Sequence, residues 1–516
     1  MATSISTPTP PSAAFSGEES RAGKLLRETF ESGRPLTYIR TTEEQRVERL
    51  LAETAARMGR QAVAGVWSWS STEGLRPSGQ PAAPDTQSPR GALDFIAAHP
   101  ASGIFLLKDF HGPLRDEPDV RRRLRDIYYR CLDQGKYIVI TSAVRFVPEE
   151  LQRSIVFIEL RTPDVHELTD FLRSELPRMA PLSQHAAINE DLLALFAPAL
   201  RGLTLEEAGY AVRRAVNSGV PLGPESLPAI RTEKQLLISR SGVIEYIGDS
   251  RNLDEIGGLD NLKLWLTERR KLFQLRDDLS SEIVPKGLLL MGIPGCGKSL
   301  CVKAISSCFQ LPLYRIDMIE IFSGRHGKPE GVFVETCRMM EEMAPAVLWF
   351  DEIEMGVTST ESAGEQGRIF AFFLTWMQEK TPGLFVAATA NRLDLLPAEM
   401  IRKGRFDEVF FVDMPIESEQ IDIFKIHLKR RGVDCTGFDF AQLVKFTNGW
   451  TGAEIEQCVI SAITKAKLAE RPVTERDLIL IAAKFVPLSR TMKEQIGQIR
   501  AWAFDRAIRA TPNPQR

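Results

Sequence analysis

The chain of 516 residues is long enough for about two to four domains, each with its own hydrophobic core. Hydrophobic residues make up 43% of the sequence and charged residues 26%, which is ordinary for a soluble globular protein. The formal net charge is −3 and no long basic run occurs, so a nucleic-acid or anionic-lipid partner is not expected. No apolar stretch approaches the length of a membrane span and no signal peptide opens the chain, so we expect no membrane insertion.

Seven cysteines are scattered along the chain, and none of them forms a C-x-x-C pair. The odd number argues against a full disulfide framework, because at least one thiol would be left over. We therefore predict reduced thiols in a protein of the cytoplasm.

A disordered tail and a first α/β region are predicted at the N-terminus. Residues 1–22 are rich in Ser, Thr, Pro and Ala, a composition typical of disorder. From 23 to 230 predicted strands alternate with helices, which indicates a parallel sheet covered on both faces. No phosphate-binding loop occurs in this half, so we interpret it as a scaffold or interaction domain. The expected strands are 36–39, 62–67, 103–109 and 137–141, the expected helices are 43–57 and 120–134, and a surface loop is expected at 76–90.

Proline and glycine residues between 221 and 228 close this region, and we predict an interdomain linker at 231–253. A second α/β region is expected at 254–415, followed by a helical segment at 416–486. Apolar residues recur with helical spacing from 488 to 510, which predicts a C-terminal helix within the last segment, 487–516.

A phosphate-binding loop is predicted in the second region, where the sequence Gly292-Ile-Pro-Gly-Cys-Gly-Lys298-Ser299 follows an apolar run and precedes a helical segment. Its glycines allow the tight turn that points successive N–H groups at phosphate oxygens. Lys298 can reach the β- and γ-phosphates, and the Ser299 hydroxyl can ligate Mg²⁺. The residues expected to contact the nucleotide here are Gly292, Ile293, Pro294, Gly295, Cys296, Gly297, Lys298, Ser299 and Leu300.

Two further apolar strands of this region end in polar side chains. The first ends in Asp351 and Glu352, and the second ends in Asn391. We expect Asp351 to hold the Mg²⁺ shell, and Glu352 to orient and polarise a water that attacks the γ-phosphate. Asn391 is expected to hydrogen-bond that water or the γ-phosphate.

Two arginines three residues apart, Arg402 and Arg405, follow these strands. They could simply pair with acidic groups on the surface. After a phosphate-binding loop and two polar strand ends, we interpret them as arginine fingers offered to the γ-phosphate of a neighbouring subunit.

Two more motifs complete the pattern: Ile256-Gly257-Gly258-Leu259 before the loop, and Trp450-Thr-Gly452-Ala453-Glu454-Ile455 in the helical segment. Together with the features above they resemble the AAA family of ring ATPases over about residues 250–486. The resemblance implies an α/β P-loop ATPase domain with a helical lid, in which Ile256, Gly257, Gly452 and Ala453 flank the adenine. It also implies that the protein binds ATP and Mg²⁺. The oligomer that the resemblance implies is a homo-oligomer of six subunits, a hexamer.

A narrower resemblance is carried by residues 375–380, 388–397 and 402–411. These segments resemble AAA proteins encoded in algal plastids and cyanobacteria and also found in other bacteria. In that family the N-terminal half looks like a degenerate AAA domain without a P-loop, and residues 206–214 would be its residual lid. A plastid-encoded member would reside in the stroma.

One stretch departs from the family pattern. Ring translocases carry an aromatic residue, a hydrophobic residue and Gly in the first pore loop, whereas Arg325 and His326 occupy those two positions here. Phe322 could substitute for the aromatic residue, but it precedes the usual position, so threading of a polypeptide through a pore is not implied by the sequence.

Two functions remain open at this point. One is an ATP hydrolase that works in an oligomeric ring and remodels or regulates a protein partner bound through the N-terminal domain. The other is an ATP-dependent scaffold or switch with slow hydrolysis and no threading of a substrate.

Overall fold

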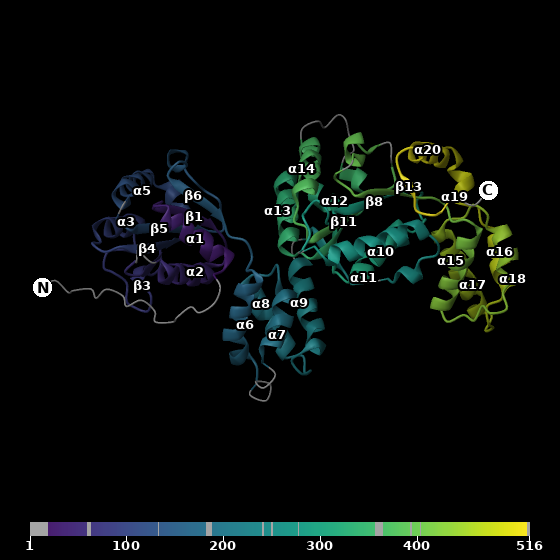
Figure 1. The fold of residues 1–516 in the computed structure, drawn as a ribbon, viewed down its shortest axis with the longest axis horizontal. Coiled ribbons are helices and arrows are strands. Elements are labelled where there is room, and N and C mark those ends of the chain that lie inside the picture. The colour runs from purple at the N-terminus through teal and green to yellow at the C-terminus, as the bar shows by residue number, and fades with distance from the viewer. Residues whose placement is uncertain are drawn as a thin grey trace. The chain divides into compact units, whose positions relative to one another are not determined.

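The computed structural model describes residues 19–58, 63–132, 134–181, 188–239, 242–248, 251–276, 278–356, 365–392, 395–402 and 404–512. The chain divides between Lys234 and Gln235 into two compact units, and each is described by itself (Figure 1). We call them the N-terminal unit and the C-terminal unit. Among the described residues, every helix is too short or too polar to cross a lipid bilayer.

A mostly parallel sheet forms the centre of the N-terminal unit, with the strand order β3-β2-β4-β5-β1-β6. All neighbouring strands run parallel except β2 and β3. The strands expected at 36–39, 103–109 and 137–141 are confirmed, whereas the strand expected at 62–67 begins only at Val66. The strands are β1 (Leu36–Arg40), β2 (Val66–Ser70), β3 (Gly74–Pro77), β4 (Gly103–Lys108), β5 (Lys136–Ser142) and β6 (Ile155–Glu159).

The stretch 76–90, expected as a surface loop, is in part a strand and in part held against the sheet. Its first two residues belong to β3, which pairs antiparallel with β2. The side-chain oxygen of Thr86 accepts a hydrogen bond from Leu75 N at 2.9 Å, and Trp69 Nε1 donates to Thr86 O at 2.7 Å. The expected surface loop is confirmed for residues 78–88, which are mostly exposed, whereas the first two residues of the stretch belong to a strand and the last two to a helix.

Helices cover both faces of the N-terminal sheet, as expected for parallel strands. Ile39 packs on one face against Phe30 and Leu51, and Tyr38 packs on the opposite face in the same cluster as Leu93. The helices over these faces are α1 (Arg21–Glu31), α2 (Glu44–Arg57), α3 (Pro89–Ala98), α4 (His111–Asp116) and α5 (Pro118–Cys131).

The first helix overlaps the predicted disordered tail of residues 1–22. The Ser20 side chain accepts a hydrogen bond from Gly23 N, which caps the helix and lets it begin at Arg21. Arg21 and Ala22 are therefore helical, and residues 1–18 lie outside the described residues.

The predicted linker at 231–253 is replaced by regular structure. The helix α9 (Leu227–Ser239) runs through the boundary between the units, and β7 (Ile244–Ile247) joins the C-terminal sheet. Pro224 and Pro228 stand in the first turns of helices, where a missing N–H costs nothing, so they do not mark a linker. The N-terminal unit carries three further helices before α9: α6 (Val165–Met179), α7 (Glu190–Leu200) and α8 (Leu205–Val216).

The C-terminal unit is built on a sheet with the order β13-β12-β8-β11-β10-β9-β7. Its five inner strands are parallel, β7 runs antiparallel to β9, and β13 runs parallel to β12. The strands after β7 are β8 (Gly287–Gly292), β9 (Leu313–Ile316), β10 (Ala346–Phe350), β11 (Leu384–Ala390), β12 (Glu408–Val412) and β13 (Ile508–Arg509).

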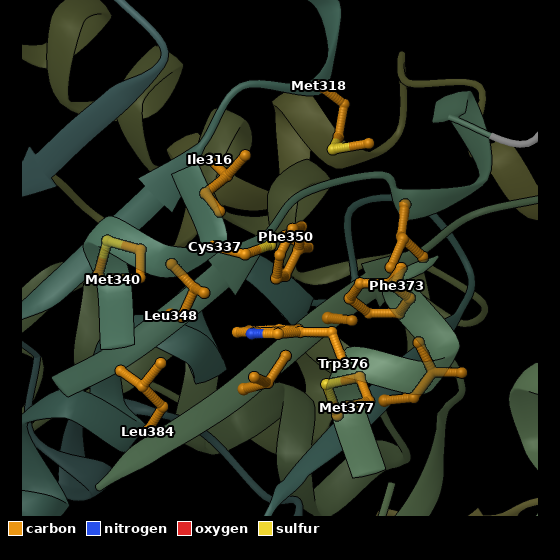
Figure 2. Packing of buried hydrophobic residues seen from close by; sticks show 14 of the residues in the cluster. Ile316, Met318, Cys337, Met340, Leu348, Phe350, Phe373, Trp376, Met377 and Leu384 are labelled. Carbon is orange, nitrogen blue, oxygen red and sulfur yellow. The ribbon is translucent and has the colours of Figure 1, made fainter. Parts of the chain in front are cut away.

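Two hydrophobic clusters lie on opposite faces of this sheet. Figure 2 shows part of one, in which Phe350 from β10 meets Phe373 and Trp376 from α14, with ring centroids of Phe350 and Phe373 5.1 Å apart. The other cluster includes residues of α10 and α11. The helices beside the sheet are α10 (Asp260–Gln274), α11 (Lys298–Phe309), α12 (Met318–Phe322), α13 (Pro329–Glu342) and α14 (Glu365–Glu379).

A helical subdomain follows β12 and has a hydrophobic core of its own. It consists of α15 (Glu417–Arg430), α16 (Phe440–Phe446), α17 (Gly452–Leu468) and α18 (Glu475–Ala482). We call these four helices the C-terminal lid.

The terminal segment is not the single helix that its periodicity predicts. It forms α19 (Leu488–Thr491), α20 (Lys493–Ala503) and then β13, which pairs with β12. The helix α20 ends at Ala503, and Ala510 N donates to the sheet, to Phe411 O at 2.9 Å, instead of continuing a helix. Phe504, expected in the packed face, is 78% exposed.

Candidate active site

The predicted phosphate-binding loop connects β8 to α11. Gly292, Gly295 and Gly297 have φ values of 144°, 78° and 94°, which side-chain-bearing residues rarely adopt. A Cβ on Gly292 would lie 2.1 Å from Val412 O, so close packing against β12 also demands glycine there. The sequence thus folds into an open loop whose backbone N–H groups precede a helix N-terminus, an arrangement suited to anions.

Lys298 is the first residue of α11 and is 6% exposed. Its Nζ donates hydrogen bonds to Gly292 O at 2.9 Å and to Ile293 O at 3.0 Å. Burial lowers the pKa of Lys298 to about 8. Two carbonyl groups solvate the ammonium but do not neutralise its charge, so the site favours an anionic ligand.

The two polar strand ends lie side by side, because β10 and β11 are parallel neighbours. Asn391 Nδ2 donates to Glu352 Oε1 at 2.8 Å. Thr389 links both carboxylate residues, since its hydroxyl donates to Asp351 Oδ1 at 2.6 Å and accepts from Glu352 N at 3.0 Å. Glu352 has φ 47°, so the chain turns sharply directly after the strand.

Glu354 was not expected in the site, yet it holds Asn391 in place. Its Oε1 accepts hydrogen bonds from Asn391 N at 2.8 Å and from Arg392 N at 3.1 Å. Glu354 is 2% exposed, and burial raises its pKa. The sequence signal that could have found it is a second acidic residue two positions after Glu352.

A cavity of about 480 Å³ joins the loop, the strand ends and the C-terminal lid. Ala453 N donates to Gly295 O at 2.9 Å, so the start of α17 contacts the phosphate-binding loop directly. A Cβ on Gly257 would lie 2.6 Å from Ile423 Cγ1, which explains why glycine stands where this segment meets α15. The predicted residues that line the cavity are Ile256, Gly257, Pro294, Gly295, Cys296, Gly297, Lys298, Ser299, Leu300, Glu352, Asn391, Gly452 and Ala453.

Several lining residues were missed by the sequence analysis. On α15, Ile423, His427 and Arg430 follow one another at helical spacing and face the cavity together. That spacing was readable in the sequence, although nothing local distinguished this face from the one packed in the lid core. The other lining residues not expected are Arg251, Glu255, Leu259, Asp413, Pro415, Glu419, Ile426 and Glu456.

The arginines Arg402 and Arg405 are not brought to this cavity by the part of the chain that the structure describes. Asp407, two residues after Arg405, accepts hydrogen bonds from Lys286 N at 2.7 Å and Gly287 N at 2.8 Å. The arginine segment is therefore tied to the start of β8, whereas the phosphate-binding loop follows its end, about 20 Å away along the six-residue strand. Arg405 donates to Glu399 O, and Arg402 is exposed.

Residues 288–414 match the ATPase family associated with various cellular activities (AAA), and residues 22–160 and 166–241 match the N-terminal and second domains of SpoVK-like AAA ATPases. The AAA domain-containing protein ycf46 of Pyropia yezoensis is 35% identical over 93% of this chain and 97% of its own. The chain belongs to this family of AAA proteins.

A second member of the family, from Trieres chinensis, is 33% identical over 92% of this chain and 95% of its own. A more distant relative is the ribosome biogenesis ATPase RIX7 of Saccharomyces cerevisiae, 33% identical over 42% of this chain and 27% of its own. The C-terminal unit is thus an AAA domain with a helical lid, and the N-terminal half matches the N-terminal and second domains of SpoVK-like AAA ATPases. The resemblance to algal plastid AAA proteins is confirmed.

Proposed function

We propose that this protein is an AAA ATPase that binds and hydrolyses ATP with Mg²⁺. The observation that carries the proposal is the hydrogen bond between Asn391 and Glu352 beside the cavity that Lys298 lines. A carboxylate held by an amide at that point can take the position of a base that orients a water toward a γ-phosphate.

The residues fit a nucleotide and its metal. Gly295 and Gly297 have the positive φ values that a tight phosphate-binding turn needs, a Cβ on Gly297 would meet nothing within 4 Å, and Lys298 supplies a buried positive charge. The Ser299 hydroxyl and the Asp351 carboxylate are oxygen ligands of the kind that Mg²⁺ prefers. When bound, Mg²⁺ would neutralise charge on the β- and γ-phosphates, and Glu352 and Asn391 would orient the attacking water.

Adenine would lie between the two segments that close the cavity on its other side. Ile256 and Gly257 come from the segment before α10, and Gly452 and Ala453 from the start of α17. The choice of adenine over guanine rests on the family resemblance.

We further propose that the protein is a homo-oligomer, a hexameric ring by family resemblance. Arg402 and Arg405 lie at the opposite end of β8 from the phosphate-binding loop, so they are out of reach of the loop of their own chain. This supports their role as arginine fingers toward a neighbouring subunit. We propose a cytoplasmic location, and the stroma for a plastid-encoded member.

Turnover would be coupled to remodelling or regulation of a protein partner, recruited through the N-terminal unit. The name of the RIX7 relative refers to ribosome biogenesis. This name supports the proposal that the present protein also acts on a macromolecular partner. Nucleic acid is not expected as the direct partner, since the net charge is −3 without a basic run.

A scaffold or switch with slow hydrolysis is the second candidate, and the loop after α12 favours it. His326 lies 3.5 Å from Glu320 Oε2 and packs so closely on Gly242 that a Cβ there would be 2.8 Å from the ring. His326 is thus held by its own chain and is not presented as a gripping side chain. This observation argues against threading of a polypeptide, and it has no bearing on the rate of ATP hydrolysis.

The decisive test measures the steady-state ATPase rate against protein concentration, with mass photometry on the same samples. We expect activity to rise steeply with assembly and to fall roughly a thousandfold in Arg405→Ala, because an arginine supplied in trans stabilises the transition-state charge. Arg490→Ala is the matched control, since Arg490 is exposed at α19 and does not line the cavity. Activity independent of concentration and of Arg405 would contradict the ring.

A further inference from the structure

The two units share one strand order around their central strands. In the N-terminal unit it is β2-β4-β5-β1-β6 and in the C-terminal unit β9-β10-β11-β8-β12, with every pair parallel. The strand β1 therefore corresponds to β8, and β4 corresponds to β10. A backbone detail supports this match: Asp109, the first residue after β4, has φ 49°, and Glu352, the second residue after β10, has φ 47°.

By this match, the residues between β1 and α2 stand where the C-terminal unit has its phosphate-binding loop. Only residues 41–43 connect β1 to α2, whereas residues 293–297 connect β8 to α11. The short connection is Thr-Thr-Glu and contains no glycine, so it cannot form the open N–H cradle.

This connection instead contains a carboxylate of the chain itself, that of Glu43. Glu43 Oε1 accepts a hydrogen bond from Leu205 N at 2.7 Å, and Glu43 Oε2 accepts one from Arg46 Nη1 at 2.8 Å. Leu205 is the first residue of α8, and the side chain of Glu43 is 10% exposed. An internal anion therefore meets a helix N-terminus and a guanidinium, the same kinds of group that hold a phosphate.

The charges across the strand end are inverted relative to the C-terminal unit. There, Lys298 begins α11 and Asp351 follows β10. In the N-terminal unit Glu44 begins α2 and Lys108 ends β4, and Lys108 Nζ lies 3.3 Å from Glu44 Oε2. Lys108 Nζ is also 2.8 Å from Glu48 Oε1. A lysine ammonium thus lies where the C-terminal unit is expected to use a metal ion.

Glu43 and Arg46 also hold two helices in place: Glu43 contacts the start of α8, and Arg46 contacts the start of α6. Arg46 is 3% exposed and its Nη2 lies 2.8 Å from Glu167, which caps the start of α6. In the C-terminal unit, Ala453 N at the start of α17 contacts Gly295 O instead. Both α8 and α17 begin with a Thr and Glu capping box, which supports the match between them.

We propose that the nucleotide site of the N-terminal unit is filled by its own side chains, with Glu43 in place of a phosphate and Lys108 in place of a metal ion. This unit then keeps its helical lid closed without a nucleotide, and the whole chain binds one nucleotide. A neighbouring cavity of about 460 Å³ is lined by four glutamates, Glu43, Glu44, Glu175 and Glu206, and by three arginines, of which Arg46 is already paired with Glu43 and Glu167. The inference does not rest on hydrolysis in the C-terminal unit.

The first test follows amide hydrogen exchange of α8 in the full chain. In the wild type, protection of α8 should be the same with and without ADP. Glu43→Ala should speed exchange at the start of α8 by about tenfold or more, because a charge-assisted hydrogen bond is lost. Acetate should slow it again by binding Leu205 N and Arg46 in place of the missing carboxylate, compared with chloride at equal ionic strength.

The matched control is Glu73→Ala, which removes an ion pair with Arg76 on the exposed surface of the same unit. Should Glu43→Ala not fold, Glu43→Gln keeps the volume and an acceptor for Leu205 N but loses the charge, and intermediate exchange is expected. Unchanged exchange in the Glu43 variants, or an acetate effect of equal size in Glu73→Ala, would overturn the proposal.

The second test counts bound ADP per chain by equilibrium dialysis. We expect one in the wild type and none in Lys298→Ala, because that variant loses the only phosphate-binding lysine that we assign. Nucleotide that remains bound to Lys298→Ala, or two per wild-type chain, would overturn the self-filled site. A wild type that binds none would overturn the proposed ATPase function instead, and the exchange experiment would still decide the N-terminal site.

Discussion

At the residue scale, the buried carboxylate of Glu354 sets the position of the amide that faces the cavity. One of its oxygens holds the backbone of Asn391 and Arg392, and among the described residues its other oxygen has no hydrogen-bond partner. The Asn391 side chain in turn holds Glu352. We therefore assign Glu354 as a positioning residue that acts through Asn391.

Glu354→Ala should lower kcat by about tenfold to a hundredfold, because a misplaced Asn391 no longer orients Glu352. Glu354→Gln should keep most of the activity, since an amide oxygen can still accept both backbone hydrogen bonds. Steady-state ATPase assays of the two variants check this. Equal losses in both variants would contradict a role that depends on the acceptor alone.

The pH dependence of stability follows from the raised pKa of Glu354, whose main cause is burial. The folded protein holds this proton more tightly than the unfolded chain, so the contribution of Glu354 to stability falls as pH rises above the ordinary glutamate pKa. Glu354→Gln cannot ionise at this position, so it does not lose stability in this way. At pH values above the ordinary glutamate pKa, its unfolding free energy should therefore increase relative to that of the wild type. Urea unfolding at a series of pH values measures the difference.

Local patterns were enough to predict the residues of the loop and the strand ends. Gly292 to Ser299 form one continuous motif, and Asp351, Glu352 and Asn391 each end an apolar strand. Glu354 and Thr389 escaped prediction because their roles depend on hydrogen bonds between β10 and β11, which only the folded sheet brings together.

At the element scale, the edge strands of the C-terminal sheet come from segments that sequence patterns do not label as strands. β7 replaces part of the predicted linker, and β13 lies within the last residues of the predicted C-terminal helix, 488–510. Both are short, and their pairing partners are distant in the sequence. Such strands are determined by an available sheet edge more than by their own periodicity.

Truncation after Ala507 should destabilise the C-terminal unit by about 2 kcal/mol, because it removes the backbone hydrogen bonds of Ala510 to Phe411 and Leu262. It should also weaken ADP binding. Thr511 Oγ1 donates to Glu419 Oε1, the same oxygen that accepts Leu259 N beside the cavity. Urea unfolding and ADP titration check both effects.

The matched control for that truncation ends the chain after Pro512 and keeps all of these bonds. It should behave as the full chain in both measurements. Loss of stability without any change in ADP affinity would show that β13 supports only the sheet and not the nucleotide cavity.

At the scale of the whole molecule, two units with the same order of central strands occur in one chain, and the fold class follows from the family resemblance as well as from the alternation of strands and helices. The sequence alone indicated a missing phosphate-binding loop in the first unit. It could not show that Glu43, Arg46 and Lys108 replace the nucleotide contacts, because their partners lie on α6, α8 and α2.

The choice between a remodelling enzyme and a scaffold is also a property of the whole molecule. Glu352→Gln should bind ATP but hydrolyse it at about one hundredth of the wild-type rate or below, because the general base is lost. Expressed in a host that lacks the wild-type gene, it should fail to restore function if turnover performs work on a partner. Lys298→Ala is the control that cannot bind ATP, and restoration by Glu352→Gln but not by Lys298→Ala would favour the scaffold.

The short connection after β1 also sets a direction for evolutionary change in the N-terminal unit. Exchanging Glu43 or Lys108 for the residues of an active site would not recreate a phosphate cradle, because three residues cannot supply the turn that 293–297 make in the C-terminal unit. Return would need an insertion and glycines together, and any intermediate that loses Glu43 would leave the start of α8 without its anion and Arg46 with Glu167 alone. Once shortened, this connection makes loss of the first nucleotide site effectively one-way for single substitutions.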